Sequence, residues 1–155
     1  MKRNTHLVPL SREHHYGLLF CWKIRQGVTL KVAAARIVPY VRYFYETHLR
    51  QHFHEEEATL FTNNDPYCQR ALTEHKEIVQ RVLQLTENEP DAAALISFAD
   101  LLDAHIRYEE RVAFPYLEQN LSQEQLDTIG NALRHLPTDA AADTYPDPFW
   151  ISTKN

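Results

Sequence analysis

Two histidines in the chain stand four residues before a glutamate: His52 before Glu56, and His105 before Glu109. In a helix, residues i and i+4 lie on one face, one turn apart, so the imidazole and the carboxylate can reach a common cation. The flanking residues repeat as well. LRQHFHEEEATLF and LDAHIRYEERVAF share the pattern Leu-x-x-His-apolar-x-x-Glu-Glu-x-x-x-Phe. The repeat therefore predicts two metal-binding turns on two different helices.

Two Glu-His dipeptides, Glu13-His14 and Glu74-His75, precede these turns in the chain. The chain therefore reads as a doubled unit, Glu-His followed by His-x-x-x-Glu. His15 competes with His14, but neighbouring residues point about 100° apart around a helix, so only one of them can face the site. The match to Glu74-His75 favours His14. The expected metal ligands are His14, His52, Glu56, His75, His105 and Glu109.

Such a ligand set favours two cations over one. Six protein ligands exceed the four of a tetrahedral zinc site, whereas two ions can share bridging carboxylates and keep open positions. Mixed imidazole and carboxylate ligands suit iron or manganese, with zinc as a further candidate. A ferritin-like carboxylate centre is disfavoured, because that class uses Glu-x-x-His and no glutamate here has a histidine three residues later.

Other polar residues near the motifs have two readings each. We expect Glu57 and Glu110 to point away from the ligand face and to be solvated, unless such carboxylates hydrogen-bond to ligand imidazoles. The tyrosines Tyr16, Tyr43 and Tyr108 either pack in the core or hydrogen-bond to a bound oxygen species. His48, one turn before His52, is either an outer hydrogen-bond partner or a surface residue.

Apolar periodicity and capping signals place these residues on helices. The first helix is expected to begin at Ser11 as its cap and to end at Gly27 with positive φ. Pro39 is expected to kink or break the second helix near Val38. The predicted helices cover residues 11–26, 29–62, 66–85, 91–115 and 122–136.

The fold class predicted from these helices is all-α. Short connections favour an antiparallel up-down-up-down four-helix bundle with a short C-terminal helix and an extended tail. The bundle domain is expected over 1–136 and the proline-containing tail over 137–155. Phe149 and Trp150 of the tail could pack on their own chain or on a second copy, which leaves a homodimer open.

Composition excludes several classes of protein. The 155 residues carry a net charge of −5 with scattered Lys and Arg, which disfavours a nucleic-acid binder. No apolar run has the length of a membrane span, and no apolar segment follows Lys2 and Arg3 as in a signal peptide. We therefore expect a cytoplasmic protein without a membrane partner, in which Cys21 and Cys68 are free thiols.

Four stretches resemble the hemerythrin (HHE) family of cation-binding four-helix bundles, and the resemblance spans roughly residues 8–118. They are REHHYGLL, HLRQHFHEEEATLF, EHKEI and HIRYEERVAFPYLE. The resemblance implies a non-haem di-iron site, bridged by two carboxylates and an oxo or hydroxo group, with the six ligands named above. It implies a small ligand such as dioxygen, nitric oxide or peroxide, and a place in iron homeostasis or stress response.

The chain departs from the oxygen-carrying hemerythrins at two positions. Where they have a fifth histidine, this chain has Val79. Their last ligand carboxylate lies five residues after the histidine of the fourth helix, which is the position of Glu110 here, whereas the expected ligand of this chain is Glu109. The pattern is more similar to a four-histidine, two-glutamate variant of bacterial di-iron proteins. One histidine fewer favours small-molecule chemistry over stable oxygen storage. Carrier, sensor, store and enzyme all stay open, as does a non-catalytic regulatory or interaction bundle with a structural metal.

Overall fold

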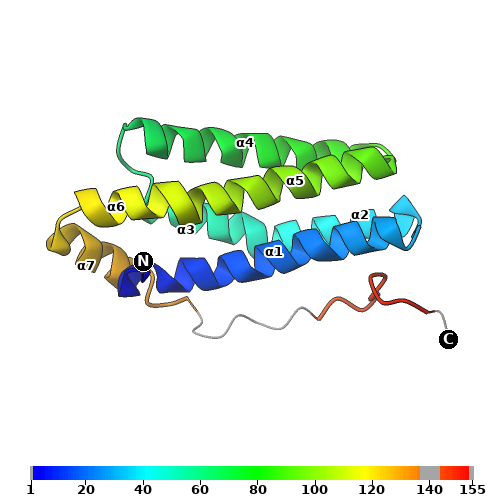
Figure 1. Ribbon diagram of the computed structural model, residues 1–155, viewed down its shortest axis with the longest axis horizontal. Helices are drawn as coiled ribbons and strands as arrows, with labels where there is room; N and C mark the ends of the chain where they lie inside the picture. Colours follow the sequence, from blue (N-terminus) through cyan, green and yellow to red (C-terminus); the bar gives the residue numbers. More distant parts are fainter. Residues whose placement is uncertain (1, 137–143, 154–155) are drawn as a thin grey trace.

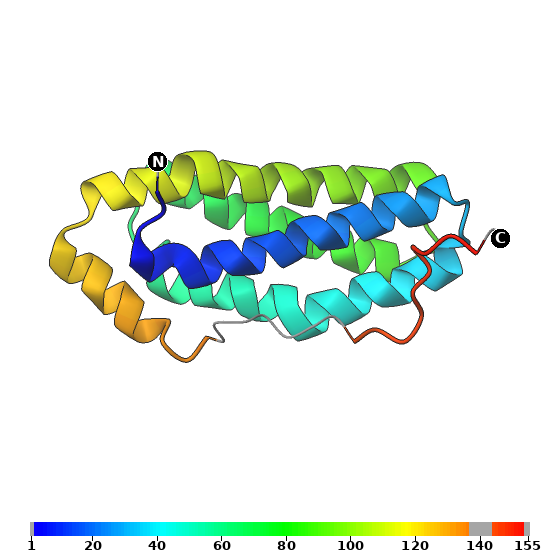
Figure 2. The same ribbon diagram turned by 60° about the horizontal axis from the view of Figure 1, so that its bottom comes forward.

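Long helices packed side by side make up the computed structural model, which describes residues 2–136 and 144–153 (Figure 1). Within these ranges every regular element is a helix, and the helices form a bundle (Figure 2). No helix of the described residues combines the length and the apolar character needed to cross a membrane. The elements are η1 (Thr5–Leu7), α1 (Val8–Thr29), α2 (Ala34–Phe44), η2 (Tyr45–Leu49), α3 (Arg50–Thr59), α4 (Pro66–Glu87), α5 (Ala92–Tyr108), η3 (Glu109–Ala113), α6 (Phe114–Asn120) and α7 (Gln123–Ala132).

The first helix is longer than its sequence signals indicate. Ser11 lies inside α1 rather than at its cap, because Pro9 takes a position in the first turn where no backbone donor is needed. The helix also continues past Gly27, which does not adopt positive φ. Lys31, with φ 58°, follows the end of the helix instead. The predicted helix start at Thr29 is therefore wrong, and the second helical segment begins at Ala34.

Both internal prolines are accommodated without ending their helices. α2 runs through Pro39 to Phe44, so the expected break near Val38 does not occur. The fourth segment likewise runs through Pro115 to Asn120. A π-helical turn directly precedes α6, and a second one joins α2 to α3. Because a π turn loosens the α-type hydrogen-bond ladder, the turn before Pro115 makes room for a residue without a backbone donor.

Two other helix starts match their sequence signals. Asp65 caps α4 by accepting a hydrogen bond from the Cys68 amide, with Pro66 in the first turn. Ser122 and Gln125 form the predicted capping box of α7. α7 ends at Ala132, before the expected 136.

The apolar core consists of two clusters, separated along the bundle by a polar layer. Along α1, Leu10 belongs to one cluster and Phe20 to the other, and His14 lies between them. Along α4, Ala71 and Ile78 bracket His75 in the same way. The ligand candidates therefore occupy a layer in the middle of the bundle, closed by apolar side chains towards both ends.

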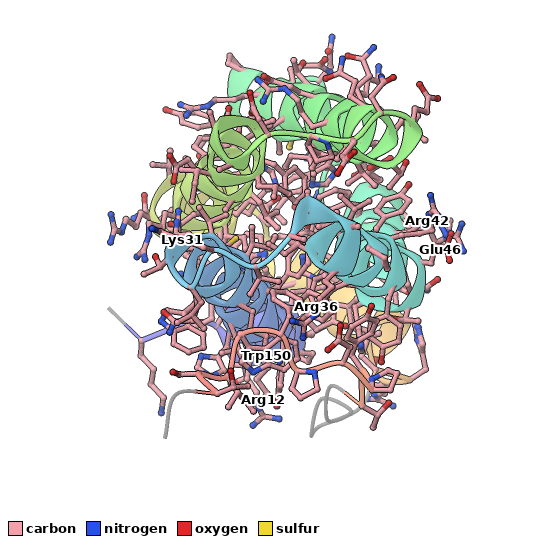
Figure 3. All side chains as sticks on the ribbon, turned by 90° about the vertical axis from the view of Figure 1, so that its right-hand side faces the viewer. Arg12, Lys31, Arg36, Arg42, Glu46 and Trp150 are labelled. Carbon is pink, nitrogen blue, oxygen red and sulfur yellow. The ribbon has the colours of Figure 1, made fainter. Side chains whose placement is uncertain are left out.

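The described part of the tail, residues 144–153, docks on the bundle as the sequence suggested. Phe149 is 2% exposed and fills the space above Gly27, where an added Cβ would lie 2.7 Å from its ring. Trp150 lies beneath the helices in the end-on view, whereas Arg42 and Glu46 project from the outside of the bundle (Figure 3). The Trp150 ring lies against the ammonium group of Lys23, with 4.1 Å between Nζ and the ring centroid. The predicted extended character of 137–143 lies outside the described residues.

Candidate metal centre

All six expected ligands meet in the polar layer. Glu56 and Glu109 are completely buried, and each of the four histidines is at most 5% exposed. They come from every long segment of the bundle, because each segment carries its ligand residues between the two apolar clusters. The contributions are His14 from α1, His52 and Glu56 from α3, His75 from α4, His105 from α5 and Glu109 from η3.

The ligand atoms divide into two groups of four that share both carboxylates. One group is His14, His52, Glu56 and Glu109, and in the other His75 and His105 replace the first two histidines. Within each group the candidate atoms lie within 4.8 Å of one another. Two cations held in this way would be bridged by both glutamates, with two imidazoles left for each ion.

The Nε2 atoms of the imidazoles point at the shared carboxylates. Nε2 of His52 and of His75 lie 3.2 and 3.1 Å from the two oxygens of Glu56. Nε2 of His14 and of His105 lie 2.9 and 3.2 Å from the two oxygens of Glu109. The same ring nitrogen of His14 is 3.3 Å from Glu56. Each carboxylate is thus flanked by imidazoles from both groups.

Charges in this layer stabilise one another strongly. Burial and the Glu109 charge would raise the pKa of Glu56, but His52 and His14 outweigh them and lower it to about 2. Burial would lower the pKa of His52, yet the Glu56 charge and a contact with Glu13 raise it to about 9. The pKa of Glu109 is held well below its usual range for the same reason as that of Glu56, chiefly by His105.

Several of the inward atoms lack hydrogen-bond partners. Nε2 of His52, His75 and His105 and both carboxylate oxygens of Glu56 are buried without a partner among the described residues. Buried polar atoms are rarely left in that state, and those that are need an explanation. Imidazole nitrogens and carboxylate oxygens are ligands for iron, manganese and zinc, so the residues present fit a pair of cations.

A second layer of four carboxylates lies against the outer nitrogens of the imidazoles, with hydrogen-bond geometry at three of them and only a longer contact at His14. Nδ1 of His52 lies 3.0 Å from Glu13, and Nδ1 of His75 and of His105 each lie 2.8 Å from a carboxylate oxygen. Nδ1 of His14 is 3.3 Å from its partner. Such partners fix the tautomer and the orientation of metal-binding imidazoles. The pairs are Glu13 with His52, Glu57 with His75, Glu74 with His105, and Glu110 with His14.

The structure shows the second of the two alternatives given for Glu57 and Glu110, contact with a ligand imidazole. Glu57 and Glu110 do point away from the ligand face of their own helices, but they reach imidazoles on neighbouring helices. A signal for this was present: every outer glutamate stands next to an inner ligand in the sequence. Glu13 and Glu74 precede a ligand histidine, and the other two follow a ligand glutamate.

Two of these carboxylates are themselves held by arginines. The Arg3 guanidinium lies 3.1 Å from Glu110, and Ser11 donates a hydrogen bond to the same side chain. Arg70 donates to Glu74 at 3.0 Å. Among the described residues, no arginine or lysine pairs in this way with Glu13 or Glu57. The outer carboxylates therefore differ: Glu74 and Glu110 are held by arginines, whereas Glu13 and Glu57 have no such partner among the described residues.

Aromatic rings shield two of the imidazoles. Phe114 stacks on His14 with ring centroids 5.3 Å apart, and Phe53 stacks on His75 at 4.0 Å. These rings limit the access of water and lower the local polarity around the centre. Both occupy apolar positions of the sequence repeat: Phe53 directly follows His52, and Phe114 is the last residue of the second copy.

A cavity of about 40 Å³ adjoins His14 and His52 of one group and is also lined by His105 of the other. A water molecule needs roughly 10–15 Å³ on this measure, so the cavity has room for a molecule of two or three heavy atoms. Its remaining walls are largely apolar, with Glu13, Tyr16 and His48 as polar exceptions. Of the other two tyrosines, Tyr108 donates to the Tyr67 carbonyl, and the Tyr43 hydroxyl pairs with Thr144.

The choice between the adjacent histidines is resolved by burial. His14 is 3% exposed and faces the cluster, whereas His15 is exposed and its ring lies against Tyr16. His48 lies beside the cavity with its ring against Phe44. His14, and not His15, belongs to the buried group that could hold a metal ion.

Comparison with known proteins adds no family assignment. The chain matches no family model, no curated protein and no solved structure. The similarity to hemerythrins consequently stays a prediction from the residue pattern. The buried histidine and glutamate groups could hold metal on the strength of their own geometry.

Proposed function

We propose that the polar layer is a non-haem di-iron centre, and that the protein is a hemerythrin-like antiparallel four-helix bundle in the cytoplasm. The observation that carries this proposal is the sharing of Glu56 and Glu109 by two groups of four buried ligands. A single cation would leave half of the imidazoles without a role. Iron suits the imidazole and carboxylate ligands, and manganese shares that preference.

The small cavity beside the centre supports a function in binding or reacting with a small molecule. Dioxygen, nitric oxide and peroxide all have the two heavy atoms for which its volume of about 40 Å³ has room. An iron pair would supply redox chemistry and open coordination positions for such a ligand. The protein would contribute the orientation of the imidazoles, through their outer carboxylates, and an apolar wall that limits water.

A structural zinc centre is the second candidate. Each group offers four protein ligands, which is the number that a closed structural zinc site takes. The protein would then be a regulatory or interaction bundle without small-molecule chemistry. The cavity favours the first candidate, because a purely structural centre has no need of space beside its ligands.

Metal analysis combined with absorption spectroscopy separates the two candidates. The protein is purified after expression in iron-rich medium, its iron and zinc are counted, and spectra are recorded with and without azide and nitric oxide. The proposal expects two irons per chain and near-ultraviolet absorption of a ferric pair that changes on azide addition. A folded protein that holds zinc and stays colourless would instead support the structural centre.

A further inference from the structure

A groove of about 560 Å³ lies between α3 and α4, next to the second group of ligands. Tyr45, Phe53 and Val79 give it apolar walls, and His75 lines it too. Its size falls within the range of small-molecule sites, roughly 300–1,000 Å³. His75 lines the groove but not the small cavity, which adjoins His14, His52 and His105 and shares Phe53 with the groove.

The groove carries more positive than negative charge. Arg50 and Lys76 line it, whereas the one carboxylate on its walls is Glu57. Neither cation forms an ion pair with a carboxylate among the residues that the structure describes, although the Arg50 guanidinium lies 6.0 Å from the Tyr45 ring. In a chain of net charge −5, two unpaired cations beside an apolar surface favour a small organic anion.

His75, which lines the groove, has a weaker outer hydrogen-bond partner than His105, the other histidine of its group. Glu57, which holds Nδ1 of His75, is 46% exposed and has no cationic partner of its own among the described residues. Glu74, which holds His105, is 20% exposed and is fixed by Arg70. Turning Glu57 into solvent would leave His75 without its outer hydrogen bond, while His105 would keep its own.

Val79 adds to this asymmetry. It lies one helical turn after His75 and lines the groove with an apolar side chain that cannot bind a metal. The His75 and His105 position therefore has no additional protein ligand on the groove side.

We propose that the groove binds a small organic anion that chelates metal, and that the cation held by His75 and His105 is loaded and removed through it. The inference rests on the proposed metal centre. Removal would be a ligand exchange in which donor atoms of the anion take the place of His75 first, and of His105 and the shared carboxylates afterwards, with no change in oxidation state. In loading, the same ligands exchange in the reverse order.

Chelators of equal donor groups and different charge test the inference. Protein loaded with ferrous iron is mixed with 1,10-phenanthroline, which is neutral, or with its 5-sulfonate, which is an anion, and complex formation is followed by absorbance. We expect the sulfonate to remove one of the two ions about tenfold faster at low ionic strength. The advantage should fall to roughly twofold or less at 1 M salt, where the screening length is about 3 Å.

A charge-matched pair of double variants localises the effect. R50Q/K76Q should abolish the advantage of the sulfonate and leave the rate with neutral phenanthroline within about twofold of wild type. R111Q/R134Q, which removes the same charge from exposed positions outside the groove, should keep the advantage. Equal effects of both double variants, or no preference for the sulfonate in wild type, would overturn the inference.

A steric pair of variants tests the groove independently of charge. Val79→Trp fills the groove and should slow removal of one ion by both chelators about tenfold or more. Leu83→Trp, one turn further along α4 and outside the groove, should leave both rates unchanged. Unchanged removal from Val79→Trp would contradict the inference, whereas a wild-type protein that binds no metal would contradict the proposed function itself.

Discussion

Glu56 and Glu109 are the two carboxylates whose burial the rest of the site must compensate. Both side chains are fully buried, and a buried carboxylate is costly unless it is paired and hydrogen-bonded. Imidazoles from four segments surround them, and the inward atoms left without partners are the atoms that could bind metal. A change at a shared carboxylate should therefore affect both cations, whereas a change at one histidine should affect one.

Glu56→Gln is predicted to lower metal content from two ions per chain to less than one. Glutamine keeps the shape of the side chain but lacks the charge and the second acceptor oxygen, so neither group retains both of its shared oxygens. Elemental analysis after iron loading measures the content. Glu55→Gln is the matched control, because Glu55 is buried next in sequence but bonds to Gln51 and His135 instead. Full metal content in Glu56→Gln would contradict the bridging role.

The metal-free protein is predicted to lose stability at alkaline pH. The pKa of His52 in the folded state, about 9, lies above its ordinary value of 6.5. Its ion pair with Glu56 therefore contributes stability that is complete below pH 6.5 and is lost as pH rises through about 9. Thermal melts of the metal-free protein between pH 6 and 10 should show a falling Tm. A metal-free melting temperature that stays constant or rises over this range would be inconsistent with these pairs.

At the residue scale, the ligand candidates were predictable from the sequence, whereas the imidazole that each outer carboxylate contacts was not. His52 with Glu56 and His105 with Glu109 follow from the i, i+4 geometry of one helix, which needs no knowledge of packing. Glu57 holds an imidazole on a different helix, and that contact depends on how the helices face each other. The sequence alone therefore leaves a solvated Glu57 and a contact with an imidazole as alternatives, and the structure shows a 46% exposed side chain in a 2.8 Å contact with His75.

At the element scale, two π-helical turns distinguish the second and fourth segments from regular helices. The turn Glu109–Ala113 contains one shared carboxylate, and the turn Tyr45–Leu49 precedes the other ligand pair. Turns of this type occur frequently at functional sites. In the fourth segment the turn places Glu109 against His105 and His14 while the next residue, Glu110, reaches the outer nitrogen of His14.

Element boundaries were less predictable than the elements themselves. Apolar spacing of three and four residues was sufficient to locate the long helices, because burial of one face determines them. Gly27 was expected to end a helix, but its small size serves packing against Phe149. Pro39 was expected to kink or break one, and the helix is not broken but continues to Phe44. At Gly27, tertiary packing outweighed the local preference of the residue.

Gly27→Ala is predicted to detach the described tail segment from the bundle. The added Cβ would lie 2.7 Å from a ring carbon of Phe149 and 3.0 Å from Ile37, so the ring must move out of its place. We expect faster proteolysis within the tail and a red-shifted tryptophan emission, with metal content unchanged. Phe149→Ala should reproduce both effects, and the exposed Thr29→Ala should reproduce neither. Protection equal to wild type in Gly27→Ala would disprove this packing role.

At the scale of the whole molecule, the layer of buried ligand candidates lies between two apolar clusters. Each long segment passes from one cluster to the other through the polar layer. Metal ions would connect all four segments at that layer and neutralise charge that the fold otherwise encloses. Binding to the folded state alone adds stability by mass action.

Removal of metal is predicted to lower thermal stability substantially while preserving the helical fold. At a free metal concentration of about 100 times Kd, each bound ion contributes about 2.7 kcal/mol. Calorimetry of chelator-treated and reloaded protein should give a Tm that falls and then recovers. Far-ultraviolet circular dichroism below the transition should remain nearly unchanged, because the apolar clusters persist. An identical Tm in both forms would mean that the ions, if bound, lie elsewhere.

Anomalous X-ray diffraction from crystals of the metal-loaded protein tests the central claim most directly. The account predicts two anomalous peaks per chain in the middle of the bundle. One should lie between His14 and His52 and the other between His75 and His105, with Glu56 and Glu109 bound to both. A single peak with one carboxylate ligand, or peaks located away from these six side chains, would contradict the account.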